Sequence, residues 1–230
     1  MTGQTVKPRD RELCIQVPTW QIIVVLLLPL LYVANARMPW AQSLWVDLDK
    51  SYYYAFWLSI VVIYFISAGI VFHFMKRSRI TMSDIGFHSS NRSSLIMVAS
   101  LVALGLLAVV FRIALPYANT DDLGFQIGWP VNTLERLFWI PIYIGAGFFE
   151  ELVYRGFAIP ALRGKSVPTW LVVVITSVAF SLIHGAADWL ISGLTFVLGV
   201  VFALIFLWRR NLALVMIIHA VADWGFLLTP

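Results

Sequence analysis

The chain has 230 residues, of which 60% are hydrophobic and only 12% are charged. Soluble domains carry about a quarter charged residues, so this composition excludes a disordered chain, a coiled coil and an ordinary soluble enzyme. The apolar runs are continuous over about twenty residues, whereas the strands of a porin-type barrel alternate polar and apolar residues. The sequence therefore predicts an all-α, polytopic membrane helical bundle. The formal net charge of +4 does not indicate nucleic acid as a partner, because excess lysine and arginine in a membrane protein mostly mark cytoplasmic loops.

Seven apolar stretches approach the roughly 20 residues that a helix needs to cross a bilayer. We expect helices because lipid cannot satisfy the hydrogen bonds of an irregular backbone. In chain order the predicted segments are about Trp20–Ala36, Tyr53–Phe74, Ser94–Pro116, Leu134–Ile159, Pro168–Ala186, Trp189–Trp208 and Leu212–Leu228.

The first segment has an alternative interpretation. Lys7, Arg9 and Arg11 precede this apolar run, and Ala34–Ala36 resembles a small-residue cleavage site. Both features also belong to a cleaved signal peptide. The charged region is long for that role, so a first membrane helix is the favoured interpretation.

The basic residues divide unequally between the two sides of the predicted segments. Twelve lie on the side of the N-terminus and three on the opposite side, while Arg112 lies inside the third segment. Since cytoplasmic loops carry the excess of lysine and arginine, we expect a multi-pass protein of the plasma (inner) membrane with a cytoplasmic N-terminus. The twelve are Lys7, Arg9, Arg11, Lys76, Arg77, Arg79, Arg92, Arg155, Arg163, Lys165, Arg209 and Arg210, and the three are Arg37, Lys50 and Arg136.

Ionisable residues inside apolar segments are informative, because such groups are costly in lipid and usually face a cavity or a partner. In the fourth segment, Glu151 and Arg155 are four residues apart, so they share a helix face and are expected to form an ion pair. Glu150 is turned about 100° away from Glu151, which leaves it available as a general base. The alternative is an interfacial ion-pair cluster at a helix end.

Histidines occur in two further segments. His184 lies late in the fifth segment, where a lone histidine is more often a hydrogen-bonding partner between helices than a catalyst. In the seventh segment, His219 and Asp223 are four residues apart and face the same side. That carboxylate is able to orient the imidazole or to pair with its protonated form. A local polar contact between helices is the alternative.

Together these residues suit the activation of a water molecule. Glu150 and His184 would act as the base, and His219 is the best candidate for the donor that a tetrahedral oxyanion requires. A zinc site formed by His184, His219 and either Glu150 or Asp223 is conceivable, but the H-E-x-x-H spacing of zinc proteases is absent. We therefore expect neither a metal nor another cofactor.

The depths of these residues present a difficulty. Counted from the neighbouring turns at 1.5 Å per residue, Glu150 and His184 lie roughly 20 and 24 Å deep, whereas His219 lies roughly 13 Å deep. Helix tilt, or a break at Pro141 or Pro160, is expected to close the difference.

The three groups read E-E-x-x-x-R, F-x-x-x-H and H-x-x-x-D in chain order. This order resembles the CPBP family, which comprises the type II CAAX prenyl proteases and the bacteriocin-processing and immunity-associated proteases. Tyr154 before the arginine and Gly156 after it also fit the family pattern. The resemblance covers Glu150–Asp223 closely and the preceding helices only in general character.

The resemblance implies an intramembrane endopeptidase of glutamate type. The family often has asparagine at its last motif position, and Asp223 departs from that form. An ionised aspartate would repel an oxyanion, so Asp223 would be either protonated or engaged in orienting His219. The implied catalytic residues are Glu150 and His184, which activate the water, and His219 and Asp223, which stabilise the oxyanion; the implied site-shaping residues are Glu151, Arg155, Tyr154 and Phe180.

Further expectations concern domains and partners. We expect a cytoplasmic tail over residues 1–18, accessory transmembrane helices over 19–133 and a CPBP-like catalytic core over 134–230. The expected substrate is a prenylated protein tail, a leader peptide or another membrane-associated peptide, with membrane lipid as the other partner. The alternatives are a non-catalytic scaffold or bacteriocin immunity protein, a small transporter with a proton relay, and a zinc-dependent membrane metalloprotease. The oligomeric state is not predicted.

Overall fold

The computed structural model describes residues 13–36, 50–87, 133–185 and 189–227. All regular elements in these ranges are helices, with no strand among them, which confirms the all-helical class. In chain order they are α1 (Thr19–Leu27), α2 (Pro29–Ala36), α4 (Lys50–Arg77), α6 (Thr133–Glu151), the π-helix η3 (Leu152–Ala158), α7 (Ile159–Gly164), α8 (Thr169–Gly185), α9 (Trp189–Arg209) and α10 (Leu212–Leu227).

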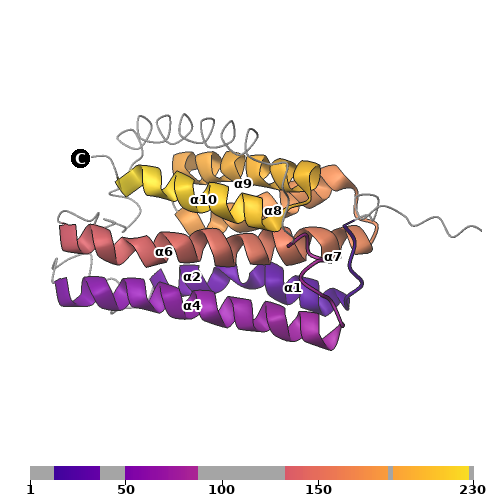
Figure 1. Cartoon of the computed structure of the whole chain (residues 1–230), viewed down its shortest axis with the longest axis horizontal. Coiled ribbons are helices and arrows are strands. Elements are labelled where there is room, and N and C mark those ends of the chain that lie inside the picture. Colours follow the sequence, from indigo (N-terminus) through magenta and orange to yellow (C-terminus); the bar gives the residue numbers. More distant parts are fainter. Residues whose placement is uncertain (1–12, 37–49, 88–132, 186–188, 228–230) are drawn as a thin grey trace, which may run out of the picture.

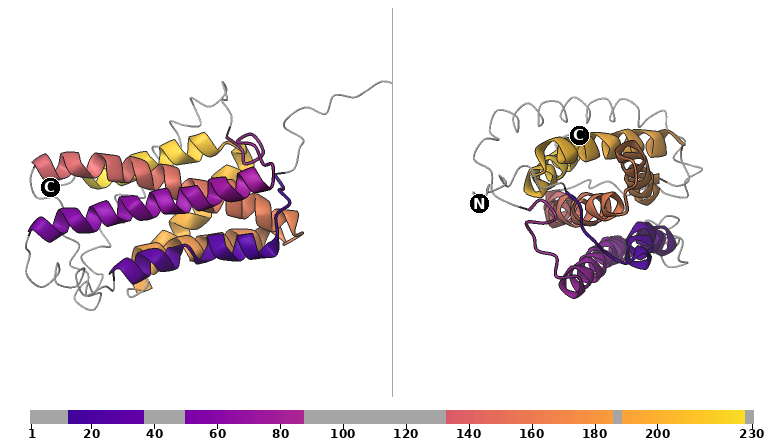
Figure 2. Two further views of the ribbon diagram at one scale, coloured as in Figure 1. Left: turned by 90° about the horizontal axis from the view of Figure 1, so that it is seen from below. Right: turned by 90° about the vertical axis from the view of Figure 1, so that its right-hand side faces the viewer.

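The helices form two rows that meet at η3. In one row α6 lies between α4 and α10, and in the other α8 lies between α2 and α9 (Figures 1 and 2). The π-helix η3 contacts α1, α4, α8, α9 and α10, and its Leu152, Phe157 and Ala158 are fully buried. The residues that directly follow Glu150 and Glu151 therefore form the centre of the apolar core.

Three of the described helical stretches are long and apolar enough to cross a membrane: Tyr54–Arg77, Thr133–Gly164 and Trp189–Arg209. Three shorter apolar helices accompany them, at Thr19–Asn35, Thr169–His184 and Leu212–Asp223. Six of the seven predicted segments thus correspond to described helices, and the third, Ser94–Pro116, lies outside the described residues. A count of seven membrane spans stays a prediction.

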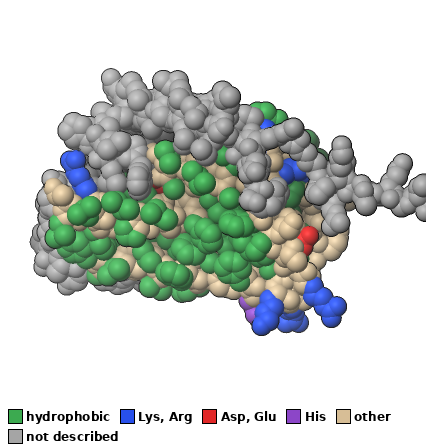
Figure 3. Space-filling view, viewed as in Figure 1, with side chains coloured by type: hydrophobic (Ala, Val, Ile, Leu, Met, Phe, Trp, Pro, Cys, Tyr) green, Lys and Arg blue, Asp and Glu red, His purple; other side chains and the backbone are tan. Residues whose placement is uncertain are grey.

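The outer surface agrees with a lipid environment. Large apolar side chains are exposed along α4 and α6, and hydrophobic side chains cover much of the described part of the face shown in Figure 3. Exposed apolar area of this extent is unusual for a soluble monomer. Examples are Leu58, Val62, Phe65, Ile66, Leu134, Leu137 and Ile144.

Three prolines of the helices, Pro29, Pro141 and Pro160, have different effects on the backbone. α1 ends before Pro29, where α2 begins, whereas Pro141 lies inside α6 without ending it. Before Pro160 the long helix widens into η3. In an α-helix, a proline ring clashes with the carbonyl of the residue four positions earlier. A π-turn contains one more residue than an α-turn, so that carbonyl no longer lies directly against the ring. A helix break was predicted at Pro141 or Pro160. The helix changes its geometry near Pro160, where it widens into η3, and continues through Pro141.

Helices α4, α7 and α9 end on the same side of the molecule, at the right in Figure 1. Each is followed by a non-glycine residue with a left-handed backbone: Arg79, Ser166 and Arg210, with φ of 54°, 59° and 51°. Basic residues occupy the last turns, at Lys76, Arg77, Arg163 and Arg209, where positive charge is favourable to the helix dipole. We call this side the basic end.

The segment after α4 folds over the turn between α9 and α10. The amide of Leu212 donates to the carbonyl of Gly86 at 2.8 Å, and Ile85 is fully buried. Asn211 caps α10 because its Oδ1 accepts a hydrogen bond from the Leu214 amide at 3.0 Å. The start of α10 is therefore covered by this segment.

Candidate active site

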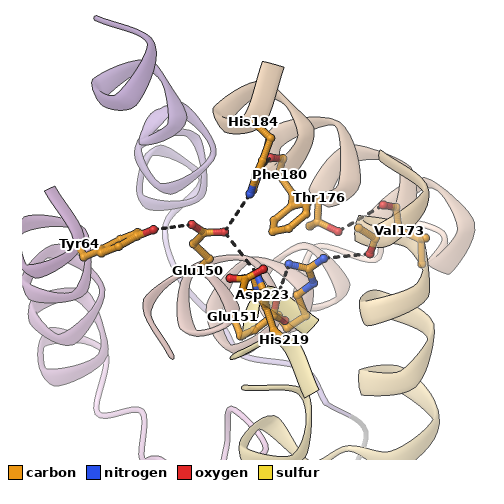
Figure 4. Close-up of polar contacts among 11 residues, drawn as sticks. Tyr64, Glu150, Glu151, Val173, Thr176, Phe180, His184, His219 and Asp223 are labelled. Atoms are coloured by element: carbon orange, nitrogen blue, oxygen red, sulfur yellow. Dashed lines mark hydrogen bonds and ion pairs between the residues drawn. The ribbon is translucent and has the colours of Figure 1, made fainter. Parts of the chain in front are cut away.

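The four predicted catalytic residues lie together in the core of the bundle. Oε2 of Glu150, on α6, is 3.9 Å from Nε2 of His184, on α8, and 4.0 Å from Nε2 of His219, on α10 (Figure 4). Oδ2 of Asp223 is 3.5 Å from Nε2 of His219. Glu150 and His219, for which the sequence predicted different depths, are therefore neighbours in the folded chain. They are 69 positions apart in the sequence.

The site is buried on one side and open on the other. The side chains of Glu150 and His219 are 5% and 3% exposed, whereas those of His184 and Asp223 are 32% and 21% exposed. His184 and Asp223 both lie near the C-terminal ends of their helices, away from the basic end.

The two carboxylate oxygens of Glu150 have different surroundings. Oε1 accepts a hydrogen bond from the hydroxyl of Tyr64, on α4, at 3.0 Å. Oε2 is buried and has no hydrogen-bond partner among the described residues. Sequence reasoning missed Tyr64, because a single tyrosine in an apolar segment gives no motif and carries no spacing signal. Glu150 is therefore held at one oxygen and available at the other.

Glu151 contacts both a charged side chain and a predicted catalytic side chain. Its Oε1 lies 2.9 Å from Nη1 of Arg155, which confirms the predicted ion pair. The same oxygen lies 2.9 Å from Nδ1 of His219. The sequence pattern connected His219 only with Asp223, but Glu151 is the closer carboxylate.

Arg155 joins the first motif to the second. It is fully buried, its Nη2 donates to the carbonyl of Gly199 at 2.9 Å, and its guanidinium lies 4.6 Å from the ring centroid of Phe180. Tyr154 meets the same ring edge-on at 5.8 Å. The predicted site-shaping residues thus form one connected layer beneath the catalytic residues. Because Arg155 is inside the bundle, counting it among the cytoplasmic loop charges was wrong.

Hydrogen bonds to Nδ1 fix the rings of both histidines. Nδ1 of His184 lies 3.1 Å from the carbonyl oxygen of Phe180, and because a carbonyl only accepts, Nδ1 carries the hydrogen. Nδ1 of His219 similarly donates to Glu151. Both Nε2 atoms consequently face Glu150, and Nε2 of a neutral His184 presents a lone pair.

A close contact between α6 and α10 brings Glu150 near His219. A Cβ atom added at Gly147 would lie 2.8 Å from both Cβ and the amide nitrogen of Ala220, and 2.8 Å from the carbonyl oxygen of Met216. Glycine allows two helix backbones to approach closely. Gly147 is one helical turn from Glu150, so this contact sets the distance across the site.

The acidic and histidine side chains of the site do not form a recognisable metal-binding group. Within the described ranges, no group of three or more histidine, cysteine, aspartate or glutamate side chains has a geometry that could hold a metal ion. The expectation of a metal-independent site stays a prediction that requires a chemical test.

The sequence of this region matches a known protein family. No curated protein and no solved structure matches the chain. A family model, described as "Type II CAAX prenyl endopeptidase Rce1-like", matches residues 132–225. This region contains all of the predicted site residues, and the family implies a protease and an integral membrane protein. Residues 132–225 thus match the Rce1-like family model of type II CAAX prenyl endopeptidases, which is consistent with the CPBP family of intramembrane proteases that the motifs indicate.

Proposed function

We propose that the protein is an intramembrane endopeptidase of glutamate type. The observation that carries the proposal is the free oxygen of Glu150, which is buried between two imidazole nitrogens at 3.9 and 4.0 Å. These separations are too long for direct hydrogen bonds. They suit a water molecule that bridges the carboxylate and an imidazole.

Glu150 and His184 would activate this water. The water donates one hydrogen to Oε2 of Glu150 and the other to the lone pair on Nε2 of His184, so that its own lone pairs face the substrate. As its oxygen bonds to the scissile carbonyl carbon, Glu150 takes the proton. The carbonyl oxygen becomes an oxyanion.

His219 would stabilise the oxyanion. Because Nδ1 already donates to Glu151, Nε2 donates only when the ring carries both hydrogens. Glu151 balances the resulting positive charge and holds the ring in place. Asp223, in its protonated form, is assigned as a second donor at the position where the family has asparagine or aspartate, since Glu151 already orients the imidazole.

Collapse of the tetrahedral intermediate completes the reaction. The carbon–nitrogen bond breaks, and the proton held by Glu150 passes to the departing amine. The second hydrogen of the water leaves the new carboxylic acid by way of Nε2 of His184 and is released to solvent. The products are therefore a carboxylate, a new amino terminus and one proton, and Glu150 and His184 return to their starting forms. No atom other than those of the peptide, the water and this proton is required.

The substrate we propose is a membrane-associated peptide. The site lies within apolar helices whose outer surface suits lipid, and it opens beside His184 and Asp223. A prenylated protein tail and a leader peptide both meet this description, and the matching family acts on the former by its name.

The first test compares the wild type with Glu150→Gln and His184→Ala. Each protein is purified in detergent and incubated with a library of quenched peptides, prenylated and unprenylated, with and without a chelator. His73→Ala is the matched control, because His73 is exposed on α4. Loss of cleavage in both site variants, retention in His73→Ala and insensitivity to chelator would support the proposal.

Two other outcomes would overturn it. Cleavage that a chelator abolishes and zinc restores would indicate a metalloprotease. A folded wild type that cleaves no peptide, together with a partner that still binds Glu150→Gln, would indicate the scaffold or immunity protein.

A further inference from the structure

We propose that Tyr64 is a positioning residue that fixes the orientation of the Glu150 carboxylate, so that one carboxylate oxygen faces the two histidines. The inference rests on the proposed function, since it assigns a role to a neighbour of the proposed base. Tyr64 lies on α4, outside the region that the Rce1-like family model matches. The active site would thus require a residue from the N-terminal helices.

The ring of Tyr64 is held firmly. It is 5% exposed, and it stacks on Phe149 with centroids 5.6 Å apart and an interplanar angle of 16°. Tyr32, from α2, packs against it at 5.7 Å. A Cβ atom added at Gly145 would lie 3.4 Å from Cδ2 of Tyr64, so the ring lies directly on the backbone of α6. The hydroxyl consequently has a fixed direction.

That direction leads to Oε1 of Glu150. The hydroxyl donates to this oxygen at 3.0 Å, and the other oxygen faces the two histidines. The terminal torsion of a glutamate is soft and nearly two-fold, so an unheld carboxylate would rotate. A half-turn only exchanges the two equivalent oxygens, but intermediate rotations would turn both away from the histidines. The Tyr64 bond holds the plane of the carboxylate, so that the oxygen opposite Tyr64 stays directed at His184. Tyr64 itself is separated from the reacting atoms by Glu150, which makes it a positioning residue.

Tyr64→Phe tests this role because it removes the hydroxyl and keeps the ring. The matched control is Tyr54→Phe, which removes a hydroxyl from the same helix about 15 Å away along its axis. A hydrogen bond to a charged group corresponds to about a 10- to 100-fold effect. We therefore expect kcat of Tyr64→Phe to fall by this factor with KM changed less than about twofold. Tyr54→Phe should retain both constants. An unchanged kcat, or a change confined to KM, would overturn the proposal.

A spectroscopic measurement makes the result independent of cleavage. The chain has four glutamates, so labelling with ¹³C-glutamate gives a simple set of carboxylate bands in the infrared, and Glu150→Gln identifies the band of Glu150. Tyr64→Phe should shift this band, and Tyr54→Phe should leave it in place. An unshifted band would overturn the proposal.

The two measurements also separate the two hypotheses. If the wild type cleaves nothing while Tyr64→Phe shifts the band, the proposed function fails and the Tyr64 contact stands. If the wild type cleaves peptides and Tyr64→Phe cleaves them equally well, the proposed function stands and the positioning role fails.

Discussion

Nδ1 of His219, on α10, lies 2.9 Å from Oε1 of Glu151, on α6. Since Arg155 contacts the same oxygen, one carboxylate atom connects a catalytic imidazole to a buried guanidinium. Glu150, the preceding residue, accepts a hydrogen bond from Tyr64 at one oxygen and presents its other oxygen to Nε2 of both histidines. Two adjacent glutamates therefore have different roles, which single substitutions are able to separate.

Glu150→Ala and Glu151→Ala should differ in stability. Glu151→Ala leaves Arg155 charged and buried, with the Gly199 carbonyl as its remaining hydrogen-bond partner among the described residues. Breaking such a buried pair costs about 3–5 kcal/mol. Glu150→Ala removes one hydrogen bond from Tyr64 and should cost about 1–3 kcal/mol, although it abolishes cleavage. Denaturant unfolding in detergent measures both values. Equal destabilisation would contradict the assignment.

Asp223→Asn should retain cleavage. Asparagine is a neutral donor of nearly the same shape, so it replaces a protonated aspartate as the second donor to the oxyanion. We expect kcat/KM within about fivefold of the wild type, and a loss of at least about tenfold in Asp223→Ala. A reversed order, with asparagine as damaging as alanine, would mean that the negative charge of Asp223 is required.

Gly147→Ala should damage the site by separating two helices. The new methyl group would lie 2.8 Å from backbone atoms of α10, so α10 must move and carry His219 away from Glu150. We expect a loss of stability of about 1–3 kcal/mol and a fall in kcat of at least about tenfold. Gly69→Ala is the control, because a Cβ atom there meets nothing within 4 Å. Similar activity in the two variants would exclude this explanation.

Cys14 offers a direct measurement of orientation. It is the only cysteine, it is exposed, and the segment from residue 13 lies near the basic end, where the Ile15 amide donates to the Pro160 carbonyl. If the basic end faces the cytoplasm, a membrane-impermeant maleimide should label Cys14 in inverted vesicles and not in intact cells. Labelling in intact cells would reverse the proposed topology.

Local spacing predicted one part of the site well. Residues four apart share a helix face, which is why the Glu151–Arg155 pair followed directly from the sequence. The same rule connected His219 with Asp223, yet their 3.5 Å separation is longer than the 2.9 Å contact between His219 and Glu151. The shorter contact depends on how α10 packs on α6, and no periodicity within either helix encodes that.

The contact between Tyr64 and Glu150 is a second example. The two residues are 86 positions apart, and they meet because α4 packs on α6, where the tyrosine ring lies beside Gly145. Similarly, Pro160 indicated a break in the long helix. The sequence did not predict that this break takes the form of a π-helix, because that form depends on how the segment packs in the core. Composition and spacing thus predicted the class of fold and the candidate residues, whereas packing determined their partners.

The π-helix after the two glutamates makes the number of residues in this segment important. Each residue of a helix turns the chain by about 100°, and η3 places additional residues in its turns between Glu151 and Pro160. Deletion of one residue in this stretch would leave its apolar character intact and would favour an ordinary α-helix. The same deletion would swing Glu150 away from His184 and His219 unless the other half of the helix rotated. The number of residues in η3, as well as their identity, therefore determines whether Glu150 faces the two histidines.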